Sequence, residues 1–128
     1  MDNEIYEREL MKTRSNYFSI GSIPCPALNN QLVRFDQQGF RHFLRKKRLM
    51  RPIPDQLRRF RLFNKHLISA IKSKDSFISD MSIRDRMKFW SIVKKISRGH
   101  QVRIIATKID NGPLCFLSIM NEKSKNSR

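Results

Sequence analysis

The chain has 128 residues, of which 39% are hydrophobic, enough for one domain that buries a single core without staples. Its 27 lysines and arginines against 11 aspartates and glutamates give a net charge of +16, so we expect a polyanion as partner. No apolar run approaches the roughly 20 residues that span a bilayer, and the start lacks the regions of a secretory signal, so we expect a cytoplasmic protein or one delivered by a signal-independent secretion route.

Residues 1–15 mix both charges without clear periodicity and predict a frayed helix or an arm. Residues 17–20 are a candidate short strand, residues 23–26 an extended linker, and residues 31–35 a second short strand. We therefore treat 1–30 as an N-terminal arm or helix that precedes the main domain.

Two helices are expected next. Residues 40–49 place Phe40, Phe43 and Leu44 at helical spacing among basic residues, which predicts a short basic helix. The Pro54-Asp55 pair is a reasonable helix start. One apolar stripe at intervals of three or four then follows: Leu57, Phe60, Phe63, Leu67 and Ile71.

After Lys74 the hydrophobic period changes to two, which predicts a run of strands with short joints. Their expected ranges are 77–83, 87–96, 102–109 and 114–120. Helices first and strands afterwards imply an α+β fold with a four-stranded antiparallel meander. We place this domain at 31–121 and expect a disordered basic tail at 122–128.

The Asn111-Gly112 pair favours a type I′ turn, because both central residues of that turn need positive φ. The resulting register pairs Thr107 with Phe116, Ile105 with Ser118 and Arg103 with Met120. One predicted face is apolar and belongs to the core: Val102, Ile104, Ala106, Cys115, Leu117 and Ile119. The other face is amphipathic: Arg103, Ile105, Thr107, Phe116, Ser118 and Met120. It is either a solvated sheet face or a site.

A tight joint at 97–100 would bring a third strand into this face, with Lys94 opposite Arg103 and Trp90 opposite Thr107. Cations, hydroxyl groups and an aromatic ring on one face form a plausible cradle for phosphates and bases. We therefore name Trp90 and Lys94 as nucleic-acid-binding candidates. A register shift of one residue would abolish the arrangement.

Residues 41–65 hold ten bases and one acid, with aromatic residues between them. Phosphate neutralisation at this density gives strong, salt-sensitive binding to nucleic acid. The alternative is a solvated helix face whose aromatic side chains pack inward. The basic candidates of this segment are Arg41, Arg45, Lys46, Arg58 and Arg59.

RNA cleavage without metal needs a base for the 2′-hydroxyl proton, cations for the phosphorane and a donor for the leaving oxygen. His42 lies among cations, which favour its neutral form as a proton acceptor. We expect no role for His66. Metal-ligand clusters, glycine-rich phosphate loops and nucleophile elbows are absent from the sequence, so we expect no metal and no cofactor.

The segments Gly39 to Lys46, Arg51-Pro52, Gln56 to Phe60, Val102 to Ile105 and Phe116 to Met120 resemble the phage-associated branch of the barnase, EndoU, colicin and RelE-like nucleases. The resemblance implies N-terminal helices packed on a four-stranded antiparallel sheet and a metal-independent ribonuclease, often a toxin. It also implies a site that combines a helix histidine with strand residues, here His42, Arg103 and Ser118. Unlike barnase, the strand run has no glutamate base.

Our leading hypothesis is a toxin-like, metal-independent endoribonuclease in which the 2′-hydroxyl attacks the phosphate. His42 would act as base or acid, Arg45 and Arg103 would hold the phosphate, and Thr107 or Ser118 would assist. One alternative is a non-catalytic module that binds an RNA or DNA backbone. Another is an interaction protein that docks on an acidic partner such as an antitoxin or immunity protein.

Overall fold

The computed structural model describes residues 2–123. The helices of this part of the chain are α1 (Asp2–Ile20), α2 (Gln37–Leu44) and α3 (Ile53–Lys72), with a 3-10 turn at Pro26–Leu28. The strands are β1 (Ser22–Cys25), β2 (Gln31–Arg34), β3 (Arg45–Lys46), β4 (Leu49–Met50), β5 (Phe77–Arg84), β6 (Met87–Ser97), β7 (His100–Ile109) and β8 (Leu114–Lys123).

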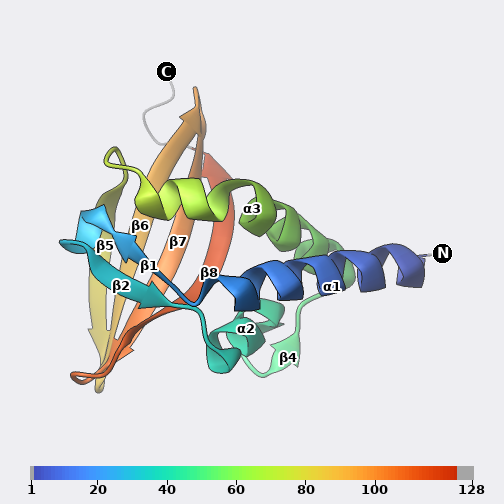
Figure 1. Ribbon diagram of the computed structural model, residues 1–128, viewed down its shortest axis with the longest axis horizontal. Helices are drawn as coiled ribbons and strands as arrows, with labels where there is room; N and C mark the ends of the chain where they lie inside the picture. Colours follow the sequence, from blue (N-terminus) through green and yellow to red (C-terminus); the bar gives the residue numbers. More distant parts are fainter. Residues whose placement is uncertain (1, 124–128) are drawn as a thin grey trace.

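The main sheet of residues 2–123 has six strands in the order β1-β2-β8-β7-β6-β5, and the predicted four-stranded antiparallel sheet is therefore wrong. The α+β class and the antiparallel order of the last four strands hold, but β2 adds to β8 in parallel and β1 pairs with β2. The sheet curls into a half-barrel, and α3 lies across β6, β7 and β8 (Figure 1).

Of the two alternatives for the N-terminal segment, a helix or an arm, the structure shows the helix, α1, and it runs on through the predicted strand. The predicted strand at 17–20 is wrong because α1 continues to Ile20 and buries Tyr17 completely. The Tyr17 hydroxyl donates a hydrogen bond to the Asp36 carbonyl at 2.8 Å. Residues 23–26 are not a linker, since Ile23, Pro24 and Cys25 pair with β2.

The predicted basic helix at 40–49 begins earlier and ends sooner, as α2. Asp36 caps it by accepting a hydrogen bond from the Gly39 amide at 2.8 Å. After Leu44 the chain turns back as the β3–β4 hairpin, with Lys47 at a φ of 56°. The bases of residues 45–48 therefore lie on an exposed hairpin and not on a helix.

Helix α3 matches its prediction, and its apolar stripe meets the sheet. Phe60, Phe63 and Leu67 are buried, and the two phenylalanine rings contact rings from α1, α2 and β8. Burying such side chains is the main favourable contribution to folding. The centre of the core is a cluster of aromatic side chains: Tyr17, Phe35, Phe40, Phe43, Phe60, Phe63 and Phe116.

The hairpin of β7 and β8 has the predicted register only at its far end. Arg103 pairs with Met120 and Ile105 with Ser118, but a bulge follows and Phe116 pairs with Ala106 instead of Thr107. Phe116 thereby enters the core, where it stacks on Phe35 with ring centroids 5.2 Å apart. Cys115 and Leu117, predicted in the core, are only half-buried. A single extra residue in one strand exchanges the two faces beyond it.

The register between β6 and β7 also differs from the predicted one. Lys94 pairs with Val102 and Trp90 with Ala106, one residue away from the expected partners, because the turn at 97–100 is irregular. Paired residues share a face, so Lys94 and Trp90 lie on the face of Val102 and not on that of Arg103. Trp90 packs half-buried against the core.

Candidate nucleic-acid interface

The predicted cradle on the sheet face does not form, and Arg103 is held by protein groups. Its guanidinium forms an ion pair with Glu122 at 2.7 Å and donates a hydrogen bond to the Ser79 hydroxyl at 2.8 Å. The hydrogen bond to Glu122 raises the pKa of Arg103 above its ordinary value. Arg103 therefore fastens β7 to β5 and β8.

Ser118 and Arg59 form a second protein contact. The Arg59 guanidinium donates one hydrogen bond to the Ser118 hydroxyl and another to the Ile119 carbonyl, both at 2.8 Å. Strand β2 pairs with β8 only at its start, at Leu114 and Cys115, so this carbonyl lies on a stretch of β8 beyond the last β2 pair. Arg59 joins α3 to that stretch. Burial and the neighbouring Arg51 lower the pKa of Arg59.

Lys94 reaches toward the end of α3. Its ammonium donates a hydrogen bond to the Ser73 hydroxyl at 2.7 Å and lies 3.8 Å from the Asp75 carboxylate. Together with its register, these contacts separate Lys94 from Arg103.

His42 and Thr107 do come together, at a cavity of about 220 Å³ between α2 and the ends of β6, β7 and β8. Asp36, Gln38 and Cys115 provide its other polar groups. No lysine or arginine of residues 2–123 lines this cavity, so it does not offer the cations that a phosphorane requires.

A basic groove lies elsewhere, between α3 and the end of β8. It has a volume of about 250 Å³ and no acidic side chain of the described residues lines it. The lining residues are Arg58, Arg61, Leu62, Lys65, His66 and Asn121. We call this set the α3 groove. All but Asn121 come from one face of α3, since they lie three, four, seven and eight positions from Arg58.

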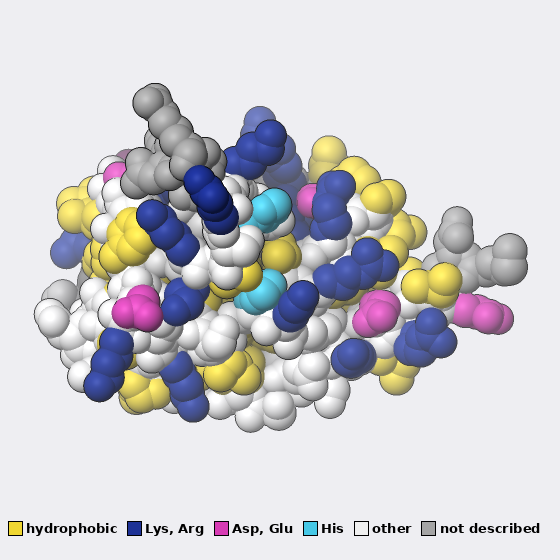
Figure 2. Space-filling model, turned by 90° about the horizontal axis from the view of Figure 1, so that it is seen from above, with side chains coloured by type: hydrophobic (Ala, Val, Ile, Leu, Met, Phe, Trp, Pro, Cys, Tyr) yellow, Lys and Arg dark blue, Asp and Glu magenta, His cyan; other side chains and the backbone are white. Residues whose placement is uncertain are grey.

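The charges of the α3 groove are available to a ligand. Arg58 is 71% exposed and its only ion pair within residues 2–123 is a 3.6 Å contact with Asp55. Arg61 and Lys65 are exposed. Burial and the neighbouring Lys65 lower the pKa of His66, so the imidazole is mainly neutral at neutral pH. Figure 2 looks down on α3 and shows lysines and arginines around two histidines on this face.

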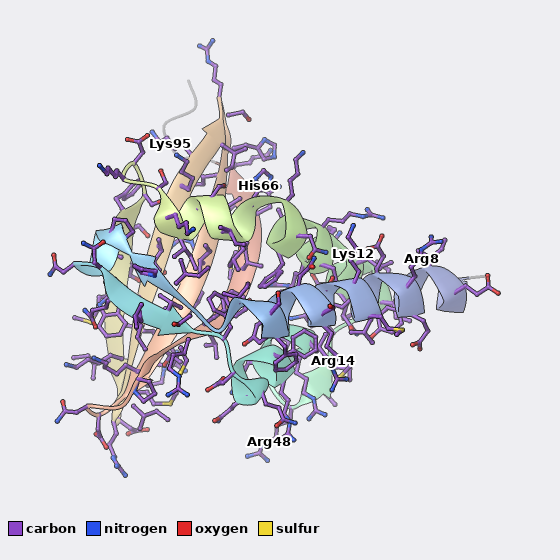
Figure 3. All side chains as sticks on the ribbon, in the orientation of Figure 1. Arg8, Lys12, Arg14, Arg48, His66 and Lys95 are labelled. Carbon is purple, nitrogen blue, oxygen red and sulfur yellow. The ribbon has the colours of Figure 1, made fainter. Side chains whose placement is uncertain are left out.

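The lysines and arginines of residues 41–65, predicted as one binding segment, lie on two sides of the molecule. Arg48, at the β3–β4 hairpin, points away from the body of the protein on the side opposite His66 (Figure 3). Arg45 and Lys46 belong to the same hairpin, and Arg41 is exposed on α2. Of the predicted binding residues, the α3 groove contains only Arg58.

Sequence reasoning missed four polar members of the groove: Arg61, Lys65, His66 and Asn121. The first three could have been found, because residues 58, 61, 65 and 66 fall on one helical face beside the apolar stripe. Asn121 could not, since its position depends on how β8 lies against α3.

Within residues 2–123, no group of three or more histidine, cysteine or acidic side chains is placed to hold a metal ion. None of the helices in this part of the chain is both long enough and apolar enough to cross a membrane. Comparisons with known protein families, with curated proteins and with solved structures give no match. The nuclease resemblance therefore stays a prediction that rests on its short motifs.

Proposed function

We propose that this protein binds the sugar-phosphate backbone of a nucleic acid in the α3 groove. The observation that carries the proposal is the groove itself, in which three cations, an imidazole and a carboxamide line one hollow without an acid among the described residues. A hollow of this composition suits phosphate oxygens, which accept hydrogen bonds from guanidinium, ammonium and amide groups.

The net charge of +16 supports the same partner. Self-repulsion of this size works against a compact fold, and a polyanion relieves it. The groove is short, so a flexible single strand suits it. Contacts to phosphates alone carry no sequence information, so we expect binding that does not depend on sequence.

Fluorescence anisotropy with labelled single-stranded RNA tests the proposal. The variant R58A/R61A/K65A removes the three cations, and we expect its affinity to fall about tenfold or more at physiological salt. The matched control R34A/R84A/K88A removes three exposed basic side chains of β-strands outside the groove, and its RNA affinity should fall much less. Equal losses of RNA affinity in both variants would contradict the proposal, because they would show that binding depends on net charge and not on the groove.

A second candidate function is metal-independent RNA cleavage in the same groove, and the position of His66 favours it. A neutral imidazole beside three cations can accept the 2′-hydroxyl proton while the oxygen attacks phosphorus and the cations hold the phosphorane charge. The 5′-oxygen then leaves with a proton from water.

Incubation with labelled RNA in EDTA tests this candidate. Cleavage would produce fragments that end in 2′,3′-cyclic phosphate, and we expect H66A to slow it by about a hundredfold. H42A is the matched control, because His42 is exposed on α2 and lines the other cavity. Loss in H42A alone would move catalysis to that cavity, and intact RNA with wild type would exclude cleavage.

A further inference from the structure

The cavity between α2 and the ends of β6, β7 and β8 is distinct from the α3 groove in both lining and charge. Its walls are largely apolar, from Met87, Ile109, Phe116 and Leu117. At about 220 Å³ it lies below the range of about 300–1,000 Å³ typical of pockets for drug-sized ligands. The cavity therefore suits one small ring rather than a whole nucleotide.

The polar groups of this cavity are mainly acceptors. Asp36 uses one carboxylate oxygen to cap α2, and its other oxygen lies 3.6 Å from the Cys115 sulfur. Burial and the charge of Asp36 raise the pKa of Cys115, so the thiol stays protonated. The Thr107 hydroxyl donates to the Lys88 carbonyl and keeps its lone pairs.

Gln38 and His42 complete the rim of the cavity, and both are exposed. Neither side chain forms a hydrogen bond within residues 2–123. They are available to the edge of a ligand. With a carboxylate nearby and no lysine or arginine of the described residues in the lining, the cavity disfavours phosphate and favours a neutral ligand that donates hydrogen bonds.

We propose that this cavity binds a nucleobase that carries an exocyclic amine, as a base subsite of the nucleic acid held in the α3 groove; as a subsite it rests on the function proposed above. The apolar walls pack on the faces of the ring, the Asp36 carboxylate accepts from the amine, and Gln38 binds the adjacent edge.

Both sites include a residue of β8. Leu117 lines the cavity and Asn121 lines the groove. Four residues separate them, or about 13 Å along the strand. Ser118 and Ile119 between them are buried, and Arg59 donates hydrogen bonds to both, so a nucleic acid that reaches both sites spans this stretch of β8 from outside rather than lying on it.

Titration of the ¹⁵N-labelled protein with cytidine and with uridine, followed by NMR, tests the inference. These nucleosides lack phosphate and differ at ring position 4, where cytidine donates from an amine and uridine accepts at a carbonyl. We expect cytidine to shift the amide signals of Gln38, Thr107, Cys115 and Leu117, and uridine to bind at least threefold more weakly.

Asp36→Asn is the sharpest variant, because asparagine caps a helix about as well as aspartate. We expect D36N to stay folded and to lose the preference for cytidine. R58A/R61A/K65A should bind cytidine like wild type while it loses RNA.

Each failure has its own signature. RNA binding without cytidine shifts at the cavity, or a cytidine preference that D36N leaves unchanged, would overturn the inference alone. Cytidine binding at the cavity without any RNA binding would overturn the proposed function and leave the cavity as a site for a free base.

Discussion

Arg59 and Arg58 are adjacent on α3, yet their contacts predict different consequences of the same substitution. Arg59 is 15% exposed and makes two 2.8 Å hydrogen bonds to β8, whereas Arg58 is 71% exposed. Hydrogen bonds to charged groups contribute about 1.5–3 kcal/mol each. The lower value taken twice gives about 3 kcal/mol, which the burial of the charge and its repulsion by Arg51 reduce, so we expect Arg59→Met to cost about 2 kcal/mol.

Urea unfolding followed by circular dichroism measures this cost. With a slope of about 2 kcal/mol/M, the midpoint of Arg59→Met should fall by about 1 M. Arg58→Met is the matched control, and an exposed ion pair predicts a change within about 0.5 kcal/mol. RNA affinity should reverse the order, because only Arg58 lines the α3 groove. Equal destabilisation by the two substitutions would refute the assignment of Arg59 as a structural link between α3 and β8.

Three other predictions concern packing and pH. Gly39→Ala should destabilise the protein by at least about 2 kcal/mol in urea unfolding, because an added Cβ would lie 2.5 Å from the Phe116 carbonyl; an unchanged midpoint would contradict the close packing of α2 on β8. Asp55 has a lowered pKa because Arg59 and Arg51 outweigh the opposing effect of burial. Its contribution to stability is present above its ordinary pKa of 3.8 and is lost as pH falls through the lower folded value, so Asp55→Asn should remove that part of the acid dependence. The pKa of His66, measured by NMR, should lie below its ordinary value in the free protein and rise when RNA binds, and an unchanged pKa would place His66 outside the interface.

The elements with long, strong periodicity could be predicted from the sequence. Helix α3 and the last four strands agree with their predicted ranges to within a few residues, because an uninterrupted apolar pattern has one way to face a core. The short segments were less predictable for the opposite reason: the strand predicted at 31–35 is present as β2, whereas the strand predicted at 17–20 is part of α1. Four residues around Tyr17 are as compatible with a strand as with a helix, and only packing against Phe35, Phe40 and Phe63 decides.

Strand register could not be predicted, and the predicted cradle depended on it. The bulge at Leu117 lets Phe116 join the aromatic core. The burial of this ring stabilises the bulged register, and a strict alternation of residues between two faces does not take it into account. The irregular turn after β6 moves Lys94 and Trp90 to the other face. His42 and Thr107 meet despite these shifts, because α2 packs on the β8 end where Thr107 and Cys115 pair.

The salt dependence of RNA binding tests the central claim, that the α3 groove holds a nucleic-acid backbone, most directly. On a single strand, each neutralised phosphate contributes about −0.7 to the slope of log affinity against log salt. Removing three contacts in R58A/R61A/K65A should therefore make the slope shallower by about 2, while R34A/R84A/K88A stays close to wild type. Equal slopes for the groove variant and wild type, or equal reductions in the groove variant and the control, would contradict the account.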